Sequence, residues 1–166
     1  MPNDHAKLAY VTDLANTPAG GGAYAVNWHA FAELKKRFRV QYAGPIVPEP
    51  PLLDAAVSKL RRRILGRSGK YYYFSEETLN RNARTVANLV ESDADAIVFR
   101  SAARWCRSKP SVPYFIYLDA VVHTCFHNTF AEADFEPAEM ERIWHEETAG
   151  LVGAAPVYAF GLGAEV

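Results

Sequence analysis

Three consecutive glycines, Gly20, Gly21 and Gly22, separate an apolar run that ends at Asp13 from a long amphipathic stretch that opens at Ala23. Glycine lets the backbone adopt positive φ and lets a ligand approach its N–H groups closely. A helix that follows adds unpaired N–H donors and the positive end of its dipole. The order of strand, glycine loop and helix is typical of the start of a nucleotide-binding α/β domain. The glycine loop therefore predicts a phosphate site at the amino end of the first helix.

The glycine loop matches a dinucleotide fingerprint only loosely. Gly20, Gly22 and Ala25 have the spacing of the fingerprint in which alanine replaces the last glycine. However, the glycines begin seven residues after Asp13, and the second expected strand, near residues 39–43, lacks the terminal acid that holds a ribose hydroxyl. We therefore expect a phosphate and no nicotinamide. The alternative is a loop that only turns the chain.

The composition of the chain limits the classes of protein to which it can belong. Its 166 residues, 49% of them hydrophobic, suffice for one globular domain with a three-layer core. The formal net charge of -1 and the absence of zinc-finger spacing argue against nucleic acid as a partner. No run of 18 apolar residues is present, so we expect no transmembrane segment. The chain contains two cysteines, Cys106 and Cys125, and we find no pattern of a secretory leader at its start. We therefore expect a reduced, cytoplasmic location.

Strand and helix patterns alternate along the chain. Apolar runs predict strands over residues 6–11, 40–43, 71–74, 95–99, 112–118 and 155–160. Helices are predicted from Ala23 through the basic residues 35–37 to Phe38, over residues 52–70, after an N-cap at Ser75, over residues 102–107 and from Pro137. Residues 44–51 are rich in proline and are expected to form an extended connector. This alternation predicts an α/β fold, a Rossmann-like three-layer sandwich with a mostly parallel sheet and helices on both faces.

The predicted helix over residues 52–70 is strongly basic. Its apolar residues follow helical spacing at Leu53, Val57, Leu60 and Ile64. Its other face carries Lys59, Arg61, Arg62, Arg63 and Arg67. One interpretation is a helix packed on the domain with a solvated charged face. The other is peripheral contact of residues 57–70 with anionic lipid at the inner face of the membrane, to which each nearby base contributes roughly 1 kcal/mol.

Polar residues follow the predicted strands at the edge where parallel α/β sheets bind ligands. Asp13 follows the first strand, Arg100 and Ser101 follow a central strand, and Asp119 follows the next, with His123 close behind. Because the carboxyl ends of parallel strands meet at one edge, we expect these residues and the glycine loop to face one crevice. Asp119 can accept a proton or orient a hydroxyl there. Its alternative role is to cap the next helix or bind loop amides.

Two histidines four residues apart, His123 and His127, flank Cys125. A zinc site built on them would need further ligands from His145, Glu146 or Glu147. We expect no metal, because isolated histidine pairs more often form hydrogen bonds or line acceptor sites. A cysteine nucleophile is not favoured either. The chain also lacks the Gly-x-Ser-x-Gly elbow of hydrolases and the Gly-Lys-Ser/Thr of P-loop proteins, so neither class is predicted.

Four segments, taken in order, carry a resemblance to a known family. They are the long loop to Gly20-Gly21-Gly22-Ala23, then Asp95-Ala-Ile-Val-Phe-Arg-Ser101, then Val112-Pro-Tyr-Phe-Ile-Tyr-Leu-Asp119, and the acidic helix from Glu139 to Glu147 with Ala155-Pro-Val-Tyr-Ala-Phe160 after it. Over essentially the whole chain this order resembles the amino-terminal half of a retaining nucleotide-sugar glycosyltransferase of family 4, also called the group 1 family, with the GT-B fold.

The resemblance implies a division of roles between two Rossmann-like domains that face each other across a cleft. The first domain holds mainly the acceptor, and the second holds the nucleotide sugar, which is a substrate and not a cofactor. The glycine loop would approach the donor phosphate, and Asp119 stands where a polar family residue assists at the reacting centre. No metal is obligatory. The implied acceptor-binding residues are Asp13, Tyr24, Arg100, Ser101 and His123.

The family's second domain, with its pair of donor-binding glutamates, has no counterpart in residues 1–166. The resemblance therefore implies that these residues are the acceptor-side domain of a chain roughly twice as long, inactive alone. The implied activity is sugar transfer in the synthesis of cell-surface polysaccharide, glycolipid or another glycoconjugate. A second hypothesis is a stand-alone Rossmann-like module that binds a phosphorylated small molecule, and a third is an oxidoreductase fragment that binds nicotinamide.

Overall fold

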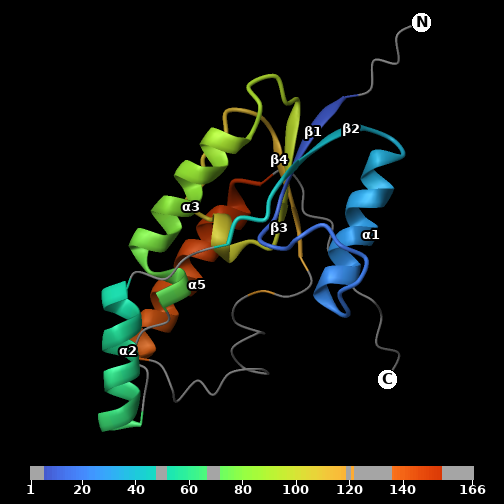
Figure 1. Cartoon of the computed structure of the whole chain (residues 1–166). Coiled ribbons are helices and arrows are strands. Elements are labelled where there is room, and N and C mark those ends of the chain that lie inside the picture. The colour runs from blue at the N-terminus through green and yellow to red at the C-terminus, as the bar shows by residue number, and fades with distance from the viewer. Residues whose placement is uncertain (1–5, 48–51, 67–71, 119–120, 122–135, 155–166) are drawn as a thin grey trace, which may run out of the picture.

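A computed structural model describes residues 6–47, 52–66, 72–118, 121 and 136–154 (Figure 1). Its four strands are β1 (Lys7–Val11), β2 (Arg39–Ala43), β3 (Ala96–Arg100) and β4 (Tyr114–Tyr117). They form one sheet in the order β2-β1-β3-β4, and every neighbouring pair is parallel. The predicted α/β fold with a parallel sheet is confirmed. The chain leaves β1 toward one side to form β2 and returns on the other to form β3, so the topological switch point lies between β1 and β3.

Helices cover both faces of the sheet, with α1 on one side and α3 and α5 on the other (Figure 1). They are α1 (Ala23–Lys35), α2 (Leu52–Leu65), α3 (Glu76–Leu89) and α5 (Pro137–Val152), and two short 3₁₀ turns are η1 (Tyr72–Phe74) and η2 (Ala103–Trp105). None of the described helices is both long and apolar enough to cross a membrane.

Alternation along each strand places side chains on opposite faces of the sheet and so builds two layers of core. Toward α1, the Tyr10 ring lies 5.8 Å from the Phe31 ring and 6.0 Å from the Tyr42 ring. Toward α3, Ile97 and Phe99 belong to a buried apolar cluster. That cluster also contains Ala9, Val11, Ala43, Ile46, Val86, Ala94, Ala102, Trp105 and Ile116. These layers hold the carboxyl ends of β1 and β3 in place.

Two helix starts follow their sequence signals. The Ser75 hydroxyl accepts a hydrogen bond from the Thr78 N–H at 3.3 Å, as expected of an N-cap. The negative charges of Glu76 and Glu77 in the first turn interact favourably with the positive end of the α3 dipole. Pro137 begins α5, where its missing N–H costs no helical hydrogen bond.

Several predicted boundaries were wrong. The predicted strand over residues 71–74 is η1 in its described part, because Phe74 turns into a second buried cluster with Leu79, Ala103 and Ile143 directly before the N-cap of α3. The helix predicted over residues 102–107 is only the 3₁₀ turn η2. Phe38 lies beyond α1 and is exposed. The strand predicted over residues 155–160 lies outside the described residues.

Candidate functional site

The first feature of the carboxyl edge is a charged cluster at the switch point, formed by Asp13, Arg100 and Arg104. The Asp13 Oδ1 atom lies 3.8 Å from Arg100 Nη1, and its Oδ2 atom lies 3.1 Å from Arg104 Nη1. The side chains of Asp13 and Arg100 are only 12% and 9% exposed, whereas Arg104 is 27% exposed. The predicted convergence of Asp13 and Arg100 is therefore confirmed. Arg104 comes from η2 and was missed by sequence reasoning.

The Asp13 carboxylate of this cluster has one oxygen without a hydrogen bond from the described residues. In the part of the chain that the structure describes, two guanidinium groups face the Asp13 carboxylate. Among the described residues, the buried Asp13 Oδ1 accepts no hydrogen bond. An unsatisfied buried polar atom costs about 1–3 kcal/mol, and such atoms in native proteins call for an explanation. The arrangement suits a ligand that donates to the carboxylate and accepts from arginine, as a sugar hydroxyl or a phosphate-bearing sugar does.

A buried polar network supports the loop that leaves Asp13. The Asn27 side chain of α1 accepts hydrogen bonds from the Tyr10 hydroxyl at 3.1 Å and the Thr12 hydroxyl at 3.0 Å. It also donates to the Tyr42 hydroxyl at 3.1 Å, and that hydroxyl donates to the Leu14 carbonyl. The Leu14 N–H in turn donates to the Thr12 hydroxyl at 3.1 Å. The network ties α1 to β1 and β2 and fixes the backbone on the carboxyl side of Asp13.

Sequence reasoning missed Asn27. Aromatic residues at helical spacing, Tyr24 and Trp28 among them, suggest an apolar face for α1, but the buried side chains of this helix are Asn27 and Phe31. The available signal was a polar residue at helical spacing from Phe31. Burial raises the pKa of the Tyr10 hydroxyl well above its ordinary value, so this tyrosine stays protonated as a hydrogen-bond donor to Asn27.

Ser101 adopts a left-handed conformation, with φ of 73°, directly after β3. Its N–H donates to the Tyr117 carbonyl of β4 at 2.9 Å. The Trp105 indole donates to the Arg100 carbonyl at 2.7 Å, which closes the turn behind the strand. Non-glycine residues in this region cost on the order of 1–3 kcal/mol and cluster at ligand sites. The backbone of this predicted site residue is therefore held rigidly under strain.

The glycine loop leads into α1 as predicted. Gly22 is the N-cap with φ of 56°, a conformation that favours glycine, and no side chain caps the helix. A Cβ at Gly20 would lie 2.4 Å from the Tyr24 Cβ, so the loop packs closely on the first turn, where Tyr24 is exposed. By contrast, a Cβ at Gly21 would meet nothing within 4 Å. The first turn contains no acidic side chain that would compete with an anion for its N–H donors.

Two predicted site residues, Asp119 and His123, lie outside the described residues, as do Cys125 and His127. No group of three or more His, Cys, Asp or Glu side chains arranged for a metal ion occurs in the part of the chain that the structure describes. Of the proposed extra ligands, His145 Nε2 lies 3.7 Å from Glu141, and Glu146 binds two arginines. The expectation that the protein needs no metal stays a prediction.

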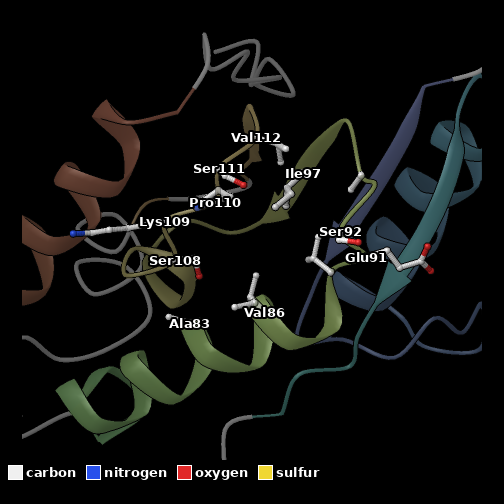
Figure 2. Close-up of a pocket in the computed structure, with 13 residues that line it drawn as sticks. Ala83, Val86, Glu91, Ser92, Ile97, Ser108, Lys109, Pro110, Ser111 and Val112 are labelled. Carbon is white, nitrogen blue, oxygen red and sulfur yellow. The ribbon is translucent and has the colours of Figure 1, made fainter.

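A cavity of about 330 Å³ lies at the opposite, amino edge of the sheet. Figure 2 shows it between α3 and the segment that precedes β4, with Val86, Ile97 and Val112 on its walls. The side chains of Glu91 and Lys109 point away from it (Figure 2). Parallel α/β proteins bind ligands at the carboxyl edge, where this chain also places its charged cluster and its strained serine. We therefore place the candidate site at the carboxyl edge and not in the cavity.

No protein-family model and no curated protein matches the sequence. The charged cluster and the glycine loop are thus the features on which a functional assignment depends.

Proposed function

We propose that the chain is the acceptor-side domain of a nucleotide-sugar glycosyltransferase. The acceptor would bind at the carboxyl edge of β1 and β3, and the glycine loop would meet the donor phosphate. The observation that carries this proposal is the cluster of Asp13, Arg100 and Arg104 at the switch point. The Asp13 Oδ1 atom, which accepts no hydrogen bond among the described residues, and the guanidinium donors beside it match the mixed hydrogen bonding of a polyhydroxylated acceptor.

The glycine loop supports the donor side of the proposal. When the acceptor hydroxyl forms its bond to the sugar, the bond to the nucleoside diphosphate breaks and charge develops on the leaving phosphate. The Tyr24 N–H donates to the Gly21 carbonyl at 3.3 Å, and the other N–H groups of the first turn, which no N-cap side chain binds, are suited to stabilise that charge. Asp119, which follows β4 in the sequence, is the proposed group at the reacting centre, with Ser101, Tyr24 and His123 as acceptor contacts.

The partners in this proposal are a nucleotide-sugar donor, held mainly by a second domain, and an acceptor of glycoconjugate synthesis. The proposed location is the cytoplasm, with peripheral contact to the inner face of the membrane through residues 57–70. The basic residues of α2 support that contact.

A transfer assay on the complete gene product, with a panel of nucleotide sugars, tests the proposal. Asp119→Ala and Gly22→Val should each reduce the turnover of the accepted donor by tenfold or more, as loss of a transition-state contact worth about 1.4 kcal/mol would. Glu141→Gln, at an exposed position of α5, is the control. Unchanged turnover in both site variants would remove the proposed roles.

The second candidate function is a stand-alone module for a phosphorylated small molecule. Two kinds of phosphate-binding group occur in this one chain, the arginines Arg100 and Arg104 and the amino end of α1, and they favour this candidate. Calorimetry on the 166-residue chain separates the two candidates. Binding of a sugar phosphate by the chain alone, abolished by Arg104→Gln, supports the module. Binding that appears only with a second domain supports the transferase.

A further inference from the structure

Helix α2 leaves its apolar face in solvent. Leu53, Val57, Leu60 and Ile64 recur at steps of four, three and four residues and so share one face of the helix, here called the apolar stripe. Each of these residues is between 53% and 80% exposed. An amphipathic helix of a globular domain normally turns such a stripe toward the core. The expectation that α2 packs its apolar face on the domain is wrong for these residues.

Basic side chains border the apolar stripe. At about 100° per residue, Arg61 and Arg63 lie on opposite flanks of the stripe, whereas Arg62 lies on the far side of the helix. Helix α2 contains one lysine and three arginines against one aspartate, a net charge of +3. Since the whole chain carries -1, the remaining residues carry -4. Positive charge is therefore concentrated on α2, whose apolar stripe is exposed.

One flank of α2 is attached to the rest of the domain. The Arg61 Nη1 atom lies 2.8 Å from Glu136 Oε1, and Glu136 is the N-cap residue of α5. Helix α2 extends beyond the sheet at the end where the carboxyl ends of the strands lie (Figure 1). Arg63, on the other flank, is exposed and available to an external anion.

We propose that α2 is an interfacial helix that binds the surface of an anionic lipid bilayer. The apolar stripe enters the boundary between head groups and acyl chains, and Arg63 and Lys59 contact lipid phosphates. An exposed apolar face bordered by bases is the combination that such helices present. A second copy of the chain fits this surface poorly, because it would bring two helices of net charge +3 together. With 14 residues, α2 is too short to span the bilayer.

This inference does not depend on sugar transfer. It places the carboxyl edge of the sheet at the same end of the molecule as the lipid surface (Figure 1). The candidate site would then bind its ligand close to the surface of the membrane. Failure of the transferase assay would leave the lipid proposal standing, and failure of lipid binding would leave the transferase proposal standing.

Vesicle co-sedimentation of the full chain tests the proposal with two matched pairs of variants. Ile64 lies on the apolar stripe and Leu65 lies off it, yet they are 69% and 68% exposed. Ile64→Ser should weaken binding to vesicles of phosphatidylcholine with phosphatidylglycerol about tenfold, and Leu65→Ser by less than about twofold. Arg63→Gln should weaken it about fivefold, and Arg62→Gln by less. Pure phosphatidylcholine vesicles and 0.5 M salt should each reduce binding.

The fold control is thermal unfolding, which should be the same for all four variants because their side chains are exposed. Absence of binding to the anionic vesicles would overturn the proposal. Equal losses within each matched pair would overturn it too, since they would mean that no particular face of α2 enters the bilayer. If the chain is a dimer that Ile64→Ser converts to a monomer, the stripe is an interface between copies and the lipid assignment is wrong.

Discussion

Two clusters of arginine and carboxylate side chains include arginines from one short segment, Arg100 and Arg104 in the first and Arg107 in the second, and differ in how completely they are bonded. In the structural network between η2 and α5, Arg107 donates to both oxygens of Glu146 at 2.7 and 2.8 Å and to Asn80 at 3.1 Å. Arg142 donates to Glu146, to both oxygens of Glu139 and to the Phe74 carbonyl. In the charged cluster at the carboxyl edge, by contrast, one oxygen of Asp13 accepts no hydrogen bond among the described residues.

The difference separates a structural role from a functional one. Bidentate, fully bonded pairs are the strong ones and hold elements together, here α5 against η1 and η2. A carboxylate with an oxygen that lacks a hydrogen bond among the described residues, beside a strained residue, stabilises the fold less, and we propose that it binds a ligand. Substitutions should therefore affect stability at the structural network and ligand binding at the charged cluster.

The largest effect on stability is expected for Glu146→Gln. This change removes the carboxylate that Arg107 and Arg142 share. Arg142 keeps Glu139, whereas the partly buried Arg107 keeps only Asn80 and the exposed Glu76 among the described residues. We expect a loss of about 2–3 kcal/mol in the free energy of unfolding, below the range for a fully buried pair. Urea unfolding measures it. Glu141→Gln, on the exposed side of α5, is the control and should change little.

Acid should weaken the same network. Burial raises the pKa of Glu146, but hydrogen bonds from Arg107 and Arg142 outweigh it, and the pKa is lowered overall from its ordinary 4.5. A carboxyl group whose folded pKa is depressed contributes stability above its unfolded pKa and loses it as the pH falls through the folded pKa. The stability difference between wild type and Glu146→Gln should shrink as the pH drops below about 4.5. A constant difference between pH 7 and pH 3 would contradict the assignment.

The next largest effect is expected for Asp13→Asn, a change that keeps the shape of the side chain and removes its charge. Acceptor affinity in the complete protein should fall at least about tenfold, equivalent to 1.4 kcal/mol. Unfolding free energy should fall by less than in Glu146→Gln, because one oxygen of the Asp13 carboxylate accepts no hydrogen bond in the part of the chain that the structure describes. Calorimetry with the acceptor and urea unfolding measure the two quantities. A larger stability loss than at Glu146 would reverse the comparison.

A smaller effect is expected in the glycine loop. Gly22→Ala places a Cβ on a residue with φ of 56° and should cost about 1 kcal/mol of stability. Gly21→Ala should be close to neutral, since nothing lies within 4 Å of its Cβ position. Thermal unfolding of the pair measures the difference. Equal losses of stability in Gly22→Ala and Gly21→Ala would show that the positive φ at Gly22 is not the reason why glycine is present there.

The smallest effect, and the only stabilising one, is expected for Ser101→Gly. Glycine adopts φ of 73° without steric cost, which offsets its greater loss of backbone entropy on folding. We expect a gain of about 0.5 kcal/mol in the free energy of unfolding. Urea unfolding checks the sign, and a clear loss of stability would mean that Ser101 is not strained.

Sequence reasoning worked where local pattern decides the structure. The order of strands and helices follows from apolar periodicity, and the meeting of Asp13 with Arg100 follows from parallel strands having their carboxyl ends at one edge. It failed where tertiary packing decides. Arg104 reaches the charged cluster only because η2 folds back on β3, and the aromatic run at η1 turns because Phe74 is drawn into a buried cluster.

The most direct test of the central claim compares Asp13→Asn with Glu146→Gln in a transfer assay on the complete gene product, at a temperature where both variants are folded. The account predicts that Asp13→Asn loses at least about tenfold in kcat/KM at nearly native stability, whereas Glu146→Gln keeps its kcat/KM at reduced stability. Losses of kcat/KM that follow the losses of stability in both variants would contradict the account, because the carboxyl edge would then be structural and not a ligand site.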